Sequence, residues 1–209
     1  MKMQLKTATI RRAVEIPLDH GTAEFATFEG LADRGEHIAL SFGEINTDSA
    51  PLVRIHSECL TGDVFQSARC DCGDQLSEAT RMFTEKGGIL LYLRQEGRGI
   101  GLYNKLDAYA LQDRGYDTYE ANSLLGLQED DREYVVAAQM LKALGVSRVR
   151  LITNNPKKVE QLNALGIEVT ETIGTGVYLK EANRNYLRAK VLRTNHQIGT
   201  VAFRKSLSN

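Results

Sequence analysis

The sequence predicts an α/β or α+β domain with a mixed β-sheet that helices flank. Two observations support this prediction: short apolar segments alternate with longer segments of helical periodicity, and a glycine follows each helical segment. The composition agrees, because 42% hydrophobic and 25% charged residues among 209 are typical of a globular protein with its own core.

Four apolar segments, each bounded by polar or glycine-containing stretches, are expected to form strands. They are residues 37–42, 52–56, 89–93 and 149–153. Apolar residues recur at helical spacing in four further segments, which are residues 75–86, 102–114, 134–144 and 157–164. The glycines that follow them suit the left-handed residue that commonly ends a helix: they are Gly87, Gly115, Gly145 and Gly166. Asn155 and Pro156 are a good N-cap and first residue for the last helix.

Charge and cysteine content exclude several classes of partner. The chain has 26 Lys and Arg residues against 27 Asp and Glu residues, so its net charge of -1 predicts no attraction to nucleic acid or to a membrane. There is no apolar run of about 18 residues, which a spanning helix would need. Three cysteines cannot all pair within the chain, and the first twelve residues do not resemble a secretory signal, so we expect a reducing, cytoplasmic location.

The C-terminal end differs from the rest of the chain. Residues 179–209 contain seven Lys or Arg residues and one Glu, a charge of +6 against -7 for the remainder. We therefore expect a main domain over residues 1–178 and a basic segment over residues 179–209 that packs on it or extends from it. Either this segment is a solvated helix with a frayed end, or it faces a polyanionic substrate or a partner subunit.

Cys59, Cys70 and Cys72 form a Cys-x10-Cys-x-Cys pattern. Thiolates suit zinc, and a structural zinc site has four protein ligands, so three cysteines favour a catalytic ion with water in the fourth position. Three thiolates donate much negative charge, and we expect this zinc to be a weaker Lewis acid than zinc bound by three histidines. Two alternatives stay open: the cysteines are small buried hydrophobes, or His56 completes a structural site.

Two segments that follow predicted strands are candidates for phosphate binding. Residues 94–101, RQEGRGIG, combine glycines that allow close approach of the backbone with Arg98, whose guanidinium can bind phosphate in a bidentate manner. Residues 153–158, TNNPKK, place Lys157 and Lys158 in the first turn of a helix, where the helix dipole disfavours cations unless an anion compensates. The alternatives are an ordinary turn and two solvated lysines.

Five motifs in this order resemble the GTP cyclohydrolase II family, whose zinc enzymes begin riboflavin biosynthesis. They are HSECLTGD from His56, RCDCG from Arg69, RQEGRGIG from Arg94, YALQD from Tyr109 and TNNPKK from Thr153. The resemblance extends from about residue 52 to residue 167 and implies the form without a fused dihydroxybutanone-phosphate synthase domain.

This resemblance implies zinc-dependent hydrolysis of GTP at C8 of guanine, with release of formate and pyrophosphate. The expected product is 2,5-diamino-6-(5-phosphoribosylamino)pyrimidin-4(3H)-one. The resemblance further implies one zinc ion bound by Cys59, Cys70 and Cys72, whose water attacks C8, together with Mg2+ on the GTP triphosphate and a homodimer.

Site residues are implied by the same resemblance. The substrate contacts are Arg54, His56, Glu58, Gln75, Glu96, Gly97, Arg98, Thr118, Thr153 and Lys158. Tyr109 matches the tyrosine that assists hydrolysis of the formamide, and Asp130 and Arg132 match the base and the nucleophile that attacks the α-phosphate. A guanidinium is a poor nucleophile because its pKa lies above about 12, so a role for Arg132 as a phosphate clamp also stays open.

Two other functions remain open at this point. One is hydrolysis or deamination of the purine ring of a different nucleotide, which nucleotide preference would distinguish. The other is a non-catalytic nucleotide-binding module with structural zinc. The set of Tyr109, Asp130 and Arg132 argues against the binding module, which needs no such groups beside an open metal site.

Overall fold

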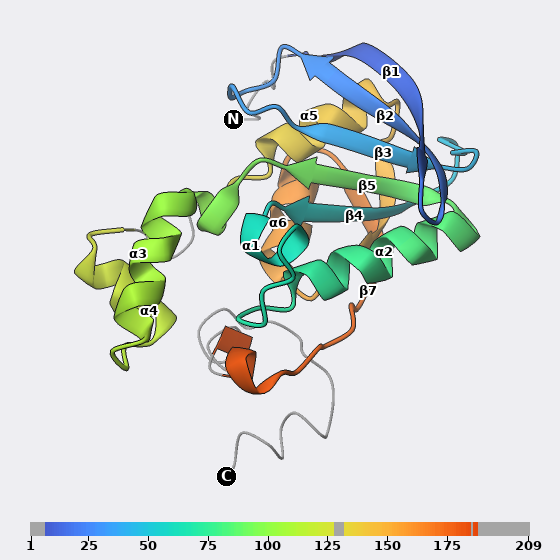
Figure 1. Cartoon of the computed structure of the whole chain (residues 1–209). Coiled ribbons are helices and arrows are strands. Elements are labelled where there is room, and N and C mark those ends of the chain that lie inside the picture. Colours follow the sequence, from blue (N-terminus) through green and yellow to red (C-terminus); the bar gives the residue numbers. More distant parts are fainter. Residues whose placement is uncertain (1–6, 128–131, 185, 188–209) are drawn as a thin grey trace.

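A mixed seven-stranded sheet forms the centre of the computed structural model, which describes residues 7–127, 132–184 and 186–187 (Figure 1). The strand order is β1-β2-β3-β5-β4-β6-β7. The first four strands in this order pair antiparallel, and β5, β4, β6 and β7 pair parallel. The strands are β1 (Thr9–Leu18), β2 (Gly21–Glu29), β3 (Ile38–Phe42), β4 (Leu52–Ser57), β5 (Gly88–Leu93), β6 (Arg148–Ile152) and β7 (Glu168–Ile173).

Six α-helices and two 3-10 helices accompany the sheet in the described part of the chain. They are α1 (Leu60–Asp63), α2 (Cys72–Lys86), η1 (Glu96–Gly99), α3 (Leu102–Gln112), α4 (Thr118–Leu124), α5 (Val135–Ala143), α6 (Pro156–Ala164) and η2 (Glu181–Asn183). The four predicted strands and four predicted helices are confirmed, and each glycine predicted to end a helix has a positive φ. The predicted N-cap is also confirmed, since Oδ1 of Asn155 accepts a hydrogen bond from the Lys157 N–H at 3.0 Å.

Helices cover both faces of the sheet. On one face, α5 and α6 pack against buried side chains of the strands, and α2 covers the other face, where Phe83 lies against Phe42 (Figure 1). Alternate residues of a strand point to opposite faces, so Val53 and Ile55 belong to the first core, whereas Arg54 lies on the face that α2 covers. No described helix has the length and hydrophobicity required to span a bilayer.

The hairpin of α3 and α4 stands away from the sheet beyond the end of β5 (Figure 1). It is joined to β5 through η1, and its larger contacts in the described part are between its own helices and with η1. The predicted division at residue 178 stays a prediction, because most of the basic segment, residues 188–209, lies outside the described residues.

Candidate active site

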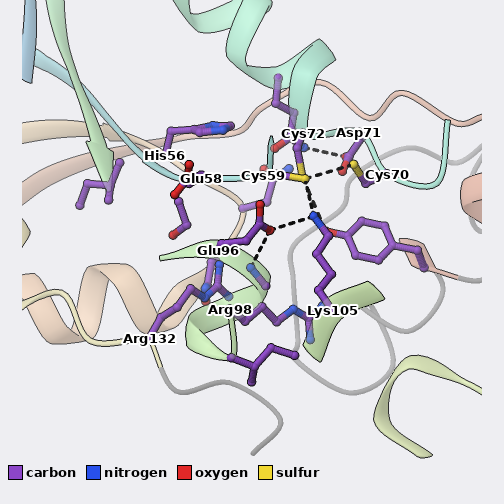
Figure 2. Close-up of a pocket in the computed structure, with 18 of the residues that line it drawn as sticks. His56, Glu58, Cys59, Cys70, Asp71, Cys72, Glu96, Arg98, Lys105 and Arg132 are labelled. Carbon is purple, nitrogen blue, oxygen red and sulfur yellow. Dashed lines mark hydrogen bonds and ion pairs between the residues drawn. The ribbon is translucent and has the colours of Figure 1, made fainter. Parts of the chain in front are cut away.

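One pocket at the carboxyl ends of β4, β5 and β6 gathers fourteen of the sixteen predicted site residues (Figure 2). They are Arg54, His56, Glu58, Cys59, Cys70, Cys72, Gln75, Glu96, Gly97, Arg98, Tyr109, Arg132, Thr153 and Lys158. Thr118 is the first residue of α4, and Asp130 lies outside the described residues. Their roles stay predictions, but their convergence agrees with a single site.

The three cysteines come together where α1 and α2 begin. Cys59 precedes α1, Cys72 is the first residue of α2, and the three sulfur atoms all lie within 4.8 Å of one another. The distance between Sγ of Cys59 and Sγ of Cys70 is 3.7 Å, close to the roughly 3.8 Å that two thiolates have on a tetrahedral zinc with Zn–S bonds of about 2.3 Å. The cluster therefore has the geometry to hold a metal ion.

The polarity of the cluster contradicts the interpretation of three hydrophobic cysteines. Hydrogen bonds from Cys70 and Cys72 lower the pKa of Cys59, and the hydrogen bond with Cys59 raises the pKa of Cys70 to about 11. The thiols therefore share protons through these hydrogen bonds, and Cys59 is the one that readily becomes a thiolate. Gly62 leaves room for the cluster, since a Cβ at this position would lie 2.8 Å from Sγ of Cys70.

His56 does not belong to the group of potential metal ligands in the described residues. Its Nε2–H donates to Asp63, with both carboxylate oxygens at 3.0 Å, and its ring stacks on Tyr92 with 5.5 Å between centroids. Burial lowers the pKa of His56, and the hydrogen bond that its ring donates to Asp63 opposes this effect without reversing it. His56 is therefore neutral near pH 7 and is oriented by Asp63.

Asp63 has a buried side chain beside the site, and the sequence analysis did not single it out. Besides His56, its carboxylate accepts hydrogen bonds from the backbone N–H of Cys59 at 2.9 Å and from the Tyr92 hydroxyl at 2.9 Å. Its side chain is only 3% exposed. Asp63 thus links the histidine of β4 to the start of the cysteine segment.

Lys105 of α3 is a second residue that the sequence analysis missed. Its Nζ donates to Oε1 of Glu96 at 2.8 Å, to the hydroxyl of Thr61 at 3.0 Å and to Sγ of Cys59 at 3.2 Å (Figure 2). Burial alone would lower the pKa of Lys105, but Cys59 and Glu96 outweigh burial and raise the pKa above its ordinary value. Lys105 is therefore a buried cation between the cysteine cluster and η1.

Two further buried cations, from β4 and α6, line the pocket. Arg54 donates to the carbonyl of Ile152 at 3.2 Å and to Oε1 of Gln75 at 2.8 Å, and its Nε has no hydrogen-bond partner among the described residues. Lys158 donates to the carbonyl of Ile55 at 2.6 Å and is 6% exposed, so it is not a solvated surface lysine. Burial lowers the pKa of Arg54, and nearby acidic groups oppose this effect.

The loop after β5 has a strained backbone. Gly97 and Arg98 have φ values of 62° and 64°, and a positive φ is costly for a residue with a side chain. Glu96 secures this loop, since its Oε2 accepts from the Leu60 N–H at 2.6 Å and its Oε1 accepts from the Gly97 N–H at 2.7 Å. The expected glycine-containing turn therefore presents the Arg98 side chain to the pocket.

Tyr109 lies between two cations at the cysteine end of the pocket. Its ring centroid is 4.9 Å from the guanidinium carbon of Arg69 and 5.8 Å from Nζ of Lys105. Burial raises the pKa of Tyr109, and Lys105 opposes this effect. The phenol therefore keeps its proton near neutral pH and is able to donate it.

The fold and the pocket define an α+β enzyme whose site combines a potential metal cluster with buried cations for an anionic substrate. The family model for GTP cyclohydrolase II matches residues 9–174. The chain belongs to this family of hydrolases, as the motifs in the sequence led us to expect.

Curated relatives agree with this membership. GTP cyclohydrolase-2 of Vibrio cholerae is 56% identical over 177 residues, which cover 84% of this chain and 89% of that protein. GTP cyclohydrolase-2 of Vibrio parahaemolyticus is 55% identical over the same length and coverage. Riboflavin biosynthesis protein RibBA of Chlorobium phaeovibrioides is 47% identical over 92% of this chain and 48% of its own length. RibBX, a two-domain 3,4-dihydroxy-2-butanone 4-phosphate synthase from A. baumannii, has a solved structure with a TM-score of 0.45 and 17% identity, covering 82% of this chain and 41% of that one.

Proposed function

We propose that this protein hydrolyses GTP at C8 of guanine and releases formate and pyrophosphate, as the first step of riboflavin biosynthesis. The product would be 2,5-diamino-6-(5-phosphoribosylamino)pyrimidin-4(3H)-one. One observation carries the proposal beyond family membership: a single pocket joins a cluster of three thiols to several buried or half-buried cations. A nucleoside triphosphate needs both, because it combines a ring to be attacked with a polyanionic tail.

The cations supply the binding energy for the triphosphate. Arg54 and Lys158 are held by backbone carbonyls of neighbouring strands, so they are positioned before the substrate arrives. Preorganised cations of this kind stabilise the charge of phosphate groups without reorganising during the reaction. Arg98 and Arg132, which also line the pocket, are further candidates for contacts to phosphate oxygens. Mg2+ on the triphosphate would neutralise the remaining charge.

The cysteine cluster would act at the base. Cys59, Cys70 and Cys72 would hold one zinc ion, since their spacing fits thiolate ligands and no fourth protein ligand lies in the cluster among the described residues. When bound, zinc lowers the pKa of water and so supplies a nucleophile near neutral pH. Neutral His56, fixed by Asp63, and Glu58 border this end of the pocket and would orient the guanine ring.

Tyr109 and Arg132 would perform the remaining steps. The protonated phenol of Tyr109 is suited to assist cleavage of the formamide after ring opening. Arg132 would act on the α-phosphate with Asp130, as nucleophile or as a clamp on developing charge. The variant Arg132→Lys separates these roles: a clamp keeps part of the rate of pyrophosphate release, whereas a role specific to guanidinium loses nearly all of it.

The decisive experiment combines metal analysis with product analysis. Purified protein is assayed for zinc and incubated with GTP and Mg2+, and its products are identified by mass spectrometry. We expect about one zinc per chain, with formate, pyrophosphate and the diaminopyrimidinone. Bound zinc with unchanged GTP and turnover of ATP would refute GTP as the substrate.

The assembly and location are part of the same proposal. A homodimer is expected from the family resemblance, and a cytoplasmic location from the composition and cysteine content. Sedimentation at micromolar concentration tests the dimer, and a single species with the mass of one chain, 23.2 kDa, would contradict it.

A further inference from the structure

We propose that Lys105 is a positioning residue that tunes the metal site. Its ammonium group donates a hydrogen bond to the Cys59 sulfur. Through Glu96 it also connects this ligand to the substrate loop, residues 94–101 after β5. The inference rests on the proposed function in one respect, namely that the cysteine cluster binds a metal. It assigns a role to a residue outside the set that the family resemblance implied.

The geometry satisfies every donor of the ammonium group. Nζ has three N–H bonds, and three acceptors surround it: Sγ of Cys59 at 3.2 Å, the hydroxyl of Thr61 at 3.0 Å and Oε1 of Glu96 at 2.8 Å. The residue is 8% exposed, so water competes little for these bonds. In Figure 2 the Lys105 side chain rises from α3 and ends between Glu96 and the cysteine sulfurs.

Two further hydrogen-bonding contacts of the cluster come from hydroxyl groups. The Tyr186 hydroxyl lies 3.9 Å from Sγ of Cys72, and the Thr61 hydroxyl lies 3.7 Å from Sγ of Cys59. Both groups are neutral, and both distances are long even for sulfur. Lys105 differs from them because a charge-assisted hydrogen bond is roughly twice as strong as a neutral one.

Three thiolates make a bound metal a weak Lewis acid, and the positive charge of Lys105 counteracts this effect. Three thiolates and one divalent ion together have a charge of -1, and the ammonium group places a positive charge directly against one of the three sulfurs. A donor at the sulfur withdraws electron density that the thiolate would otherwise give to the metal. Groups that hydrogen-bond to metal ligands orient them and tune the metal in this way. Lys105 therefore makes the bound metal a stronger Lewis acid.

Glu96 extends the effect to the substrate loop. Its carboxylate binds Lys105, the Leu60 N–H and the Gly97 N–H, so one buried ion pair joins α3, α1 and the loop after β5. A variant without the ammonium group leaves this carboxylate, which is 10% exposed, without its cation. We therefore expect loss of Lys105 to alter both the metal and the position of the loop.

The test uses protein loaded with Co2+ in place of zinc, because the sulfur-to-cobalt charge-transfer band reports the electron density on the thiolates. We expect Lys105→Met to move this band to longer wavelength and to lower kcat for GTP by 10- to 100-fold. Lys105→Arg keeps the charge, so its band should stay near the wild-type position. Lys86→Met, the same substitution at the exposed end of α2, is the matched control and should change neither quantity.

The outcomes separate this inference from the proposed function. An unshifted band in folded, cobalt-loaded Lys105→Met would overturn the role of Lys105 alone. A shifted band in an enzyme whose wild type leaves GTP intact would support Lys105 and refute the substrate. Absence of any sulfur-to-cobalt band in the wild type would overturn both. If Lys105→Met does not fold, Lys105→Gln, which keeps a neutral N–H donor, should show a smaller shift in the same direction, and an unshifted band would overturn the inference.

Discussion

Substitution of Gly62 by alanine tests the metal cluster with little change elsewhere. Its new Cβ would lie 2.8 Å from Sγ of Cys70 and 3.1 Å from Sγ of Cys59, whereas comfortable non-bonded contacts begin at about 3.5 Å. The sulfurs must therefore move by roughly 0.4 to 0.7 Å, more than the tolerance of about 0.2 Å in metal–ligand distances. We expect Gly62→Ala to weaken zinc binding at least tenfold, a cost of about 1.4 kcal/mol or more.

The assay for Gly62→Ala is competition for zinc with a chelator of known affinity, together with the melting temperature of metal-free protein. Alanine is favoured over glycine in helices, so the metal-free variant should be as stable as the metal-free wild type. Val64→Ala, which shortens a side chain that is 60% exposed at the end of the same helix, is the control and should keep wild-type zinc affinity. Wild-type affinity in folded Gly62→Ala would refute the assignment of the cluster.

Three further predictions follow from buried side chains. Tyr109→Phe removes the phenolic proton, so the formyl-bearing intermediate should accumulate while opening of the guanine ring continues, as mass spectrometry of the products would show. Burial lowers the pKa of His56, so below about pH 6.5 the unfolded state takes up a proton that the folded state does not, and stability falls by up to about 1.4 kcal/mol per pH unit as measured by urea unfolding. Phe83→Ala removes a fully buried ring and should cost about 3 to 5 kcal/mol in the free energy of unfolding.

Each of these predictions has an outcome that would contradict it. Complete conversion to the deformylated product by Tyr109→Phe would exclude its assigned role. For the pH effect, His56→Asn should flatten the slope of the free energy of unfolding against pH between pH 6.5 and 5.5. The control His20→Asn, at an exposed position, should keep the wild-type slope. Equal slopes for the two variants would show that another group causes the effect. Phe65→Ala removes a ring that is 72% exposed and should stay within about 0.5 kcal/mol of the wild type, so a similar cost for both phenylalanine variants would refute the argument from burial.

The strands that the sequence predicts are those with the stronger apolar signal. Strands β4 and β5 are buried on both faces, so almost every residue in them is hydrophobic or lies in the site. Strand β1, by contrast, is exposed along nearly its whole length and contains Arg11, Arg12 and Glu15. It is held as a strand by its ladder of hydrogen bonds with β2, and such pairing leaves no hydrophobic pattern in the sequence.

The sequence predicts those residues of the candidate site that residue type and local spacing indicate. The three cysteines lie within fourteen positions of one another, and their type alone indicates a metal. Lys105 gives no such signal, because a lysine in an amphipathic helix is ordinary and its partner Cys59 lies 46 positions away. Asp63 lies inside a recognised motif, but its contact with Tyr92 spans 29 positions and depends on the pairing of β4 with β5.

The structure also decides between alternatives that the residues left open. His56 is three positions from Cys59 and could have completed a structural site, yet its Nε2 is bound to Asp63. Lys157 and Lys158 are neighbours in the sequence, but only Lys157 is exposed. Helix α6 turns the Lys158 side chain toward β4, a direction that follows from the packing of the helix on the sheet and is absent from the local sequence.

The antiparallel and the parallel halves of the sheet have different roles in the molecule. Among the described residues, the pocket takes none of its lining from the chain before β4, so the antiparallel strands β1, β2 and β3 contribute to the site only by supporting β5. His37, directly before β3, accepts a hydrogen bond from the Arg94 N–H at 2.9 Å, so this separation applies to the β1–β2 hairpin. Natural variation in residues 9–29 should change how much enzyme is folded and leave the turnover of each folded molecule unchanged. The hairpin is therefore a region where tags or fluorescent labels can be placed without disturbing the chemistry.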